Sequence, residues 1–228
     1  MPRGSAQATL FFGGARRGGG AHELLDPCGI SSHEDCLYVA DFGNHRVLRL
    51  CLDAAAAEGE EPQVPSDVTC VLGCSGRGAG LGHLAGPAAC AFHDGWLYVA
   101  DFWNHRVIRT KVAAMASAAR SSVGGAEGVE LVFGGRGRGD RMDQLYGPRD
   151  LAFHGGVLYI ADWGNDRILR LRPGSKVAEL LAGGTEPSMD ATPVGLFARG
   201  GHPGAAAVQL KRPRGLTLHR GRLYVTDS

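Results

Sequence analysis

A phrase of 13 residues recurs through this chain. It reads LYVADFGNHRVLR from Leu37 to Arg49, and close copies begin at Leu97 and Leu158. A fourth copy begins at Leu223 and covers only Leu-Tyr-Val-Thr-Asp before the chain stops. Such self-similarity is typical of repeat architectures, in which each supersecondary unit stacks on its neighbours. The repeat therefore constrains the fold more than any single residue does.

The register of the repeat extends upstream of this phrase. A proline lies 11 residues before the tyrosine of each copy, at Pro27, Pro87, Pro148 and Pro213. A histidine follows each proline by 6 residues, at His33, His93, His154 and His219. The third copy contains four short apolar runs separated by turn signals, over residues 149–153, 157–161, 168–171 and 177–181. The unit is predicted to be a four-stranded antiparallel meander, as in one β-propeller blade.

The proline-led first strand, the Tyr-Val-Ala-Asp segment and the following Asn-His-Arg resemble the NHL-repeat family of β-propellers. The resemblance covers almost the whole chain. It implies an all-β propeller of four-stranded antiparallel blades, in a ring of about six. The third copy departs from the pattern, because Asp166 stands where the first two copies have His45 and His105.

We expect residues 1–228 to form a single, incomplete propeller. Three full blades, a partial blade and the outer strand of a preceding or closing blade are predicted over residues 27–72, 87–133, 148–181, 213–228 and 8–14. Three explanations stay open: the chain is a fragment, the N-terminal strand closes a four-bladed ring, or two copies pair their open ends. The last predicts self-association, because unpaired strand edges are templates for pairing.

The polar residues of the phrase have a structural interpretation. The aspartate can accept backbone N–H bonds in the turn that follows, or pair with the arginine five residues later. The asparagine can bond its own turn. Because a catalytic residue is rarely needed once per blade, we assign these side chains to the fold. They are Asp41, Asn44, Arg46, Asp101, Asn104, Arg106, Asp162, Asn165, Arg167 and Asp227.

Charge and hydropathy patterning narrow the function classes. The net charge is +1 at pH 7, which gives no case for nucleic-acid or membrane binding by overall charge. No run of 18 apolar residues is present, so no transmembrane helix is predicted. The cysteines lack zinc spacing, and free cysteines in or beside strands act as small apolar side chains, at Cys28, Cys36, Cys70 and Cys90. We therefore expect a reducing, cytoplasmic location.

Two motifs invite a ligand interpretation that their repetition weakens. The four histidines lie at the hairpin between the first two strands, and a ring of histidines near a propeller axis can bind a metal ion such as zinc. Histidine is also an ordinary turn residue, so no metal or other cofactor is predicted. The glycine-rich loop at residues 73–80 precedes a strand, whereas a dinucleotide fingerprint lies between a strand and a helix.

Basic residues gather in or just after the loops that precede the prolines. The repeat places them on one face with Trp103, which lies in the turn between strands two and three. They are Arg77, Arg136, Arg138, Arg141, Arg149, Lys211, Arg212 and Arg214. Arginines beside an aromatic ring can bind RNA or anchor a protein partner. A solvated surface of mixed charge is the simpler alternative, because acidic residues are interspersed at Asp140, Asp143 and Asp150.

Propellers of the resembled kind present a rigid face of loops to a partner. The leading hypothesis is a non-catalytic scaffold that binds a protein or peptide, or another ligand, through this loop face. An RNA-binding module that uses the basic residues is one alternative. A propeller-type lyase or lactonase with a metal at the central axis is another. Such an enzyme needs non-repeated polar residues at the axis, and the sequence singles out none.

Overall fold

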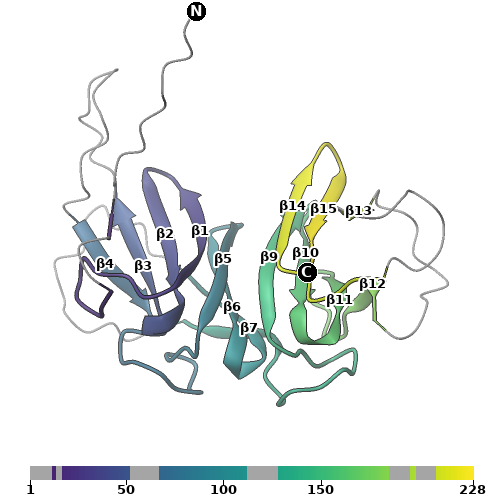
Figure 1. The fold of residues 1–228 in the computed structure, drawn as a ribbon, viewed down its shortest axis with the longest axis horizontal. Helices are drawn as coiled ribbons and strands as arrows, with labels where there is room; N and C mark the ends of the chain where they lie inside the picture. Colours follow the sequence, from purple (N-terminus) through teal and green to yellow (C-terminus); the bar gives the residue numbers. More distant parts are fainter. Residues whose placement is uncertain (1–11, 14–16, 52–66, 112–127, 185–195, 199–208) are drawn as a thin grey trace, which may run out of the picture.

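The computed structural model describes residues 12–13, 17–51, 67–111, 128–184, 196–198 and 209–228. The described chain is all-β, and its strands form four sheets arranged side by side (Figure 1). Its helical segments are 3-10 turns of three residues, none of which could cross a membrane. The outer strand expected over residues 8–14 falls outside the described residues, apart from Phe12 and Gly13.

Three of the sheets have four antiparallel strands in sequence order. The first contains β1 (Pro27–His33), β2 (Cys36–Asp41), β3 (Arg46–Cys51) and β4 (Asp67–Leu72). The second contains β5 (Pro87–His93), β6 (Trp96–Asp101), β7 (Arg106–Lys111) and β8 (Glu130–Gly134). The third contains β9 (Pro148–His154), β10 (Val157–Asp162), β11 (Arg167–Leu171) and β12 (Glu179–Gly183). The predicted class, four-stranded antiparallel sheets in an all-β fold, is confirmed.

The fourth sheet differs from the others. It has the strand order β13-β15-β14 and contains β13 (Leu196–Ala198), β14 (Gly215–His219) and β15 (Arg222–Thr226). Its outer strand β13 runs parallel to β15, whereas β14 and β15 form an antiparallel hairpin.

The two ends of the sheets present different surfaces. The first strands β1, β5, β9 and β14 pack against one another in this order at the centre of the molecule. The hairpins that follow these strands lie at the top of Figure 1, and we call this end the hairpin face. The opposite end is the turn face, made of the loops before each proline and the turns η1 (Phe42–Asn44), η2 (Phe102–Asn104) and η3 (Trp163–Asn165).

The apolar core lies between neighbouring sheets. Between the first two sheets it contains side chains that are at most 3% exposed, including Tyr38, Val47, Leu72, Leu97 and Ile108. Equivalent clusters lie between the second and third sheets and between the third and fourth. The middle strands are thus covered on both faces, which explains why they read as continuous apolar runs.

A β-bulge interrupts the first strand of each four-stranded sheet next to its proline. In the first sheet Pro27 faces Asp41 and Gly29 faces Ala40, so Cys28 is the extra residue. The same shift makes Ala88 and Arg149 the extra residues of β5 and β9. Because a bulge redirects the side chain of the extra residue, the position after each proline is set apart from the regular alternation of the strand.

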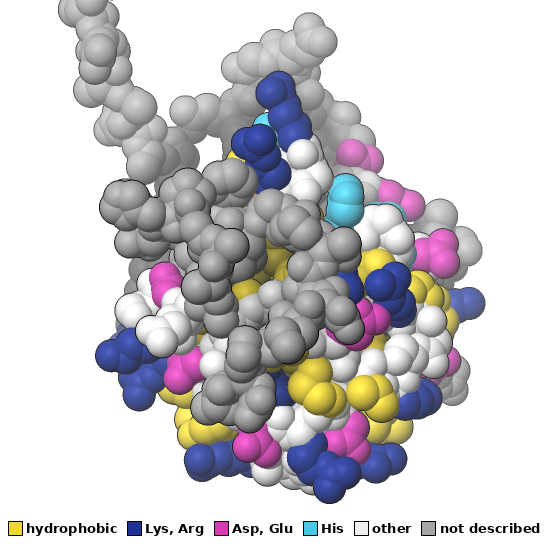
Figure 2. All heavy atoms as spheres, turned by 90° about the vertical axis from the view of Figure 1, so that its right-hand side faces the viewer, with side chains coloured by type: hydrophobic (Ala, Val, Ile, Leu, Met, Phe, Trp, Pro, Cys, Tyr) yellow, Lys and Arg dark blue, Asp and Glu magenta, His cyan; other side chains and the backbone are white. Residues whose placement is uncertain are grey.

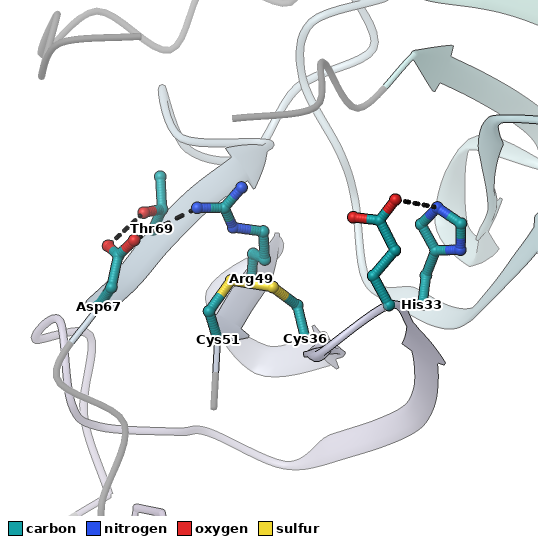
Figure 3. The surroundings of a disulfide bond; sticks show 7 residues. His33, Cys36, Arg49, Cys51, Asp67 and Thr69 are labelled. Carbon is teal, nitrogen blue, oxygen red and sulfur yellow. Dashed lines mark hydrogen bonds and ion pairs between the residues drawn. A yellow bond between two sulfur atoms is a disulfide. The ribbon is translucent and has the colours of Figure 1, made fainter. Parts of the chain in front are cut away.

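Two disulfides in the first sheet correct the expectation of free thiols. Cys36 in β2 faces Cys51 in β3 and is bonded to it (Figure 3). Cys70 is bonded to Cys74. The interpretation of Cys36 and Cys70 as small apolar side chains is therefore wrong, whereas Cys28 and Cys90 are free. The spacing could not reveal the first pair, because strand register brings together residues 15 positions apart. The pairing also removes the argument for a reducing compartment.

Candidate binding site on the turn face

The repeated aspartate, asparagine and arginine form one hydrogen-bonded clamp in each four-stranded sheet. In the second sheet, Asp101 Oδ2 accepts from Asn104 Nδ2 at 2.7 Å and from Arg106 Nε at 2.8 Å. Its Oδ1 accepts the Ala85 N–H at 2.7 Å. Arg106 also donates to three carbonyl oxygens of the preceding loop, those of Ala79, Gly80 and His83. Equivalent side-chain bonds join Asp41, Asn44 and Arg46, and Asp162, Asn165 and Arg167.

The backbone groups that the clamp binds are not those expected from the sequence, because they lie in the loop before the proline and not in the turn that follows. The aspartate does not cap the turn that follows; the N–H it accepts lies 16 residues earlier, at Leu25, Ala85 or Tyr146. The asparagine donates to a carbonyl 26 residues earlier rather than to its own turn. In the fourth sheet Asp227 Oδ2 accepts the Lys211 N–H at 3.4 Å. The clamp therefore pins the loop before the proline to the turn after the second strand.

The clamp carboxylates are enclosed rather than available to a ligand. The three aspartates are fully buried. Burial raises the pKa of Asp101 and Asp162, while their hydrogen bonds to asparagine, arginine and a backbone N–H oppose that rise. Every carboxylate oxygen of these aspartates already has a hydrogen-bond donor. The aspartates therefore stabilise the turn face, and a ligand would contact other residues.

The residue after the asparagine connects each sheet to the next. His45 Nδ1 accepts the Gly86 N–H at 3.0 Å, and His105 Nδ1 accepts the Gly147 N–H at 3.1 Å. In the third sheet the departure at Asp166 preserves this function, because its Oδ1 accepts the Arg212 N–H at 2.6 Å. Each donor is the residue immediately before the proline of the next sheet.

The hairpin histidines pack against neighbouring sheets. His33 stacks on Phe92 with ring centroids 4.4 Å apart, and His93 stacks on Phe153 at 4.3 Å. His154 and His219 make no comparable ring stack among the described residues, and Leu218 stands at the phenylalanine position of the fourth sheet. The described residues contain no group of three or more metal-ligating side chains. The four histidines are therefore not gathered into such a group.

The basic residues predicted from the sequence differ in their contacts and exposure. Arg136 and Arg141 each lie 3.4 Å from the Asp143 carboxylate and are strongly exposed. Arg138 lies 3.8 Å from the centroid of the Tyr146 ring, and Arg77 forms a β-bridge with Leu84. Lys211 and Arg212 are exposed. Figure 2 shows cationic and anionic side chains intermixed on the side that it presents, rather than a surface of one sign.

A row of aromatic rings runs along the turn face. Phe42 and Phe102 have ring centroids 5.8 Å apart, and Phe102 lies 5.6 Å from Trp163. Trp163 in turn lies 6.4 Å from Tyr146. Trp103 contacts Phe102 edge-on at 4.8 Å and remains 51% exposed. We call these five residues the aromatic row; its members hold one another in place, and Trp103 presents the largest exposed aromatic surface.

A cavity of about 370 Å³ lies among the inner strands β1, β5, β9 and β14. Its lining includes Cys28, Arg149 and Arg214, the residues that follow three of the repeat prolines, together with Asp150. The guanidinium carbon of Arg149 lies 5.9 Å from the ring centroids of both Phe42 and Phe102, so the cavity borders the aromatic row.

Two further groups define the chemistry of this cavity. Asp150 accepts the Leu151 N–H at 2.8 Å and the Leu216 N–H at 2.6 Å, while burial raises the pKa of its carboxyl group. Burial, followed by the charge of Asp150, raises the pKa of the Cys90 thiol to about 12. This thiol is therefore protonated at neutral pH and unsuited to nucleophilic attack.

Sequence reasoning named Arg149 and Arg214 as loop-face residues but missed that they line the cavity with Cys28 and Asp150. A signal was available in the two positions that follow each repeat proline. Across the four copies these positions read Cys-Gly, Ala-Ala, Arg-Asp and Arg-Gly, so charge enters in the later copies alone.

Comparisons with known proteins identify the fold. A model of the LVIVD repeat matches residues 148–168. An auxiliary nutrient binding protein from Bacteroides thetaiotaomicron VPI-5482 is similar in structure, with a TM-score of 0.57 and 14% identity over 91% of this chain and 46% of its own. One from Bacteroides ovatus ATCC 8483 has a TM-score of 0.50 and 12% identity over 86% and 43%. No curated protein matches the sequence.

These similarities establish the class of protein. The chain has a β-propeller-type repeat fold built from four-stranded antiparallel blades. It spans less than half the length of the two nutrient-binding structures.

Proposed function

We propose that this chain is a non-catalytic, NHL-type propeller that binds a protein or peptide partner through its turn face. The observation that carries the proposal is Trp103, which is 51% exposed at a row of packed aromatic rings. Tryptophan and arginine dominate the binding energy of protein interfaces when they sit on well-ordered surroundings. Arg212, with its guanidinium 5.0 Å from the Trp163 centroid, supplies a nearby cation.

The rigidity of the turn face supports this proposal. The clamps fix each loop to the next turn. The backbone N–H groups that His45, His105 and Asp166 accept fix each sheet to its neighbour. A partner would therefore meet a preorganised surface, so less conformational entropy is lost on binding.

Selection of peptides tests the proposal without a known partner. A random peptide library is selected on the immobilised chain, and the affinities of the enriched peptides are then measured for Trp103→Ala. We expect a loss of about thirtyfold or more, because removal of an interface anchor costs at least about 2 kcal/mol. Leu131→Ala is the matched control, since Leu131 is 45% exposed on the peripheral strand β8. Peptides that bind the wild-type chain and Trp103→Ala equally well would refute the assignment.

RNA binding is a second candidate because Arg138 stacks on Tyr146 beside the same row. Pairing of Arg136 and Arg141 with Asp143 counts against it. Titration of single-stranded RNA at two salt concentrations separates the candidates: RNA recognition predicts affinity that falls steeply with salt and weakens in Arg138→Ala. Salt-independent or unmeasurable RNA binding would exclude RNA recognition and leave a protein or peptide as the proposed partner.

The cysteine pairing bears on compartment. Disulfides persist in oxidising compartments and are rare in the cytosol. With Cys36 bonded to Cys51 and Cys70 to Cys74, our proposal is an oxidising location in place of the cytoplasmic one. The NHL type of the repeat, a ring of six blades and self-association through strand edges remain predictions.

A further inference from the structure

Arg149 and Arg214 belong to the minority of described arginines that have no carboxylate partner in the described part of the chain. Most described arginines donate to a carboxylate, as Arg106 does to Asp101 and Arg170 does to Glu179. Neither Arg149 nor Arg214 forms an ion pair with a carboxylate of the described residues, and the side chain of Arg149 has one polar contact there, 3.8 Å from Cys28 Sγ. Both nevertheless line the cavity among the inner strands.

The strand geometry explains why Arg149 is not neutralised. Arg149 is the extra residue of the bulge in β9, so its side chain departs from the strand alternation and lies beside the rings of Phe42 and Phe102. The neighbouring carboxylate of Asp150 is already bonded to two backbone N–H groups, of Leu151 and Leu216. Asp150 thus lowers the local charge without occupying either guanidinium group.

We propose that this cavity binds a small organic monocarboxylate. Two arginines and one aspartate give the lining a net charge of +1, which matches a carboxylate better than a phosphate dianion. The planar guanidinium group suits bidentate recognition of a carboxylate. The remaining walls include Ile30, Ala88 and Ala89, which are apolar contacts for the ligand body. A volume of about 370 Å³ is within the range of small-molecule pockets.

Close packing of the strands at the cavity wall indicates a cavity of defined shape and not a loosely packed gap between sheets. A Cβ placed on Gly29 would lie 2.7 Å from Ala89 Cα, so β1 approaches β5 more closely than a larger residue allows. Asp150 ties β9 to β14 across the same wall through its bond to Leu216.

Calorimetric titration of the 228-residue chain with sodium benzoate tests the proposal near neutral pH. We expect saturable binding by the wild-type chain and an affinity at least about tenfold lower in Arg149→Gln and in Arg214→Gln, because each change removes a charge-assisted hydrogen bond. Arg136→Gln is the matched control: Arg136 is an exposed arginine outside the cavity, and its change should leave benzoate affinity unaltered. Circular dichroism verifies that each variant is folded.

Three results would overturn the inference. The first is the absence of saturable benzoate binding by the wild-type chain, and the second is equal affinity in wild type, Arg149→Gln and Arg214→Gln. The third is tighter binding of inorganic phosphate than of benzoate, which would contradict the charge argument. Because Arg214 is exposed, its variant is expected to fold even if Arg149→Gln does not. The titration uses no protein partner, so its outcome is independent of the function proposed above.

Discussion

Replacement of His105 tests how the sheets are held together. Its Nδ1 atom accepts the Gly147 N–H of the next sheet at 3.1 Å, which requires the neutral imidazole. In His105→Ala the Gly147 N–H loses its acceptor, and we expect a cost of about 1 kcal/mol. For a chain of this size that corresponds to a fall of about 2–4 °C in melting temperature.

Asp166 indicates the variant that should rescue this bond. It occupies the equivalent position of the third sheet, has the same left-handed conformation with φ of 53°, and accepts the Arg212 N–H. His105→Asp should therefore retain a stability close to that of the wild-type chain. The nearby Arg138 cation, which repels a protonated His105, would attract the new carboxylate.

The pH dependence supplies the second half of the test. Burial, and then the charge of Arg138, lowers the pKa of His105, while the Phe102 backbone and Asp101 act in the opposite direction. A lowered folded-state pKa means that this stabilisation is complete above the unfolded pKa of about 6.5 and is lost as pH falls through the folded value. Tyr146 also packs on the ring, with the two ring centroids 5.7 Å apart.

Urea unfolding followed by tryptophan fluorescence between about pH 5 and 8 measures both effects. The difference between wild type and His105→Ala should shrink as the pH falls, and His105→Asp should lack the wild-type decline in this range. His154→Ala, which removes an exposed hairpin histidine, is the control. Equal losses in His105→Ala and His105→Asp, or a difference that does not vary with pH, would refute the reasoning.

Two further predictions concern the clamp and the cysteines. Asp101→Asn strips the Arg106 guanidinium group of its carboxylate, with Arg106 only 6% exposed, and should cost about 3 kcal/mol or more. Asp143→Asn affects exposed pairs and should cost less than about 1 kcal/mol, so similar urea midpoints would contradict the clamp. Iodoacetamide should label Cys28 in the native chain, Cys28 and Cys90 after unfolding, and all six cysteines after reduction. Labelling of four or more cysteines before reduction would disprove the two disulfides.

The sequence was sufficient for the parts of the fold that depend on local order. Proline-led strands, turn residues and apolar runs recur at a fixed spacing, and local signals of this kind determine strands and hairpins. Pairing of Asp101 with Arg106 was also accessible, because the two lie opposite each other on neighbouring strands of one hairpin.

The remaining features depend on contacts between distant parts of the chain. The Ala85 N–H reaches Asp101 from 16 residues upstream, and His45 reaches Gly86 of the next sheet. Likewise, Cys36 meets Cys51 through strand register. Composition and spacing do not predict such partners, because a hydrogen-bonding side chain such as aspartate or histidine can pair with many different groups of the chain.

Differences among the repeats then become informative about function. The clamp residues are identical in three copies because each copy must solve the same packing problem, and at the next position Asp166 replaces histidine with another acceptor. The residue after the proline follows no such rule: it is Cys28, Ala88, Arg149 or Arg214. Four such different side chains at one repeat position show that the blade does not require a particular residue there. Two unpaired arginines at a position of this kind, both lining one cavity, are more economically explained by a ligand than by the stability of the fold.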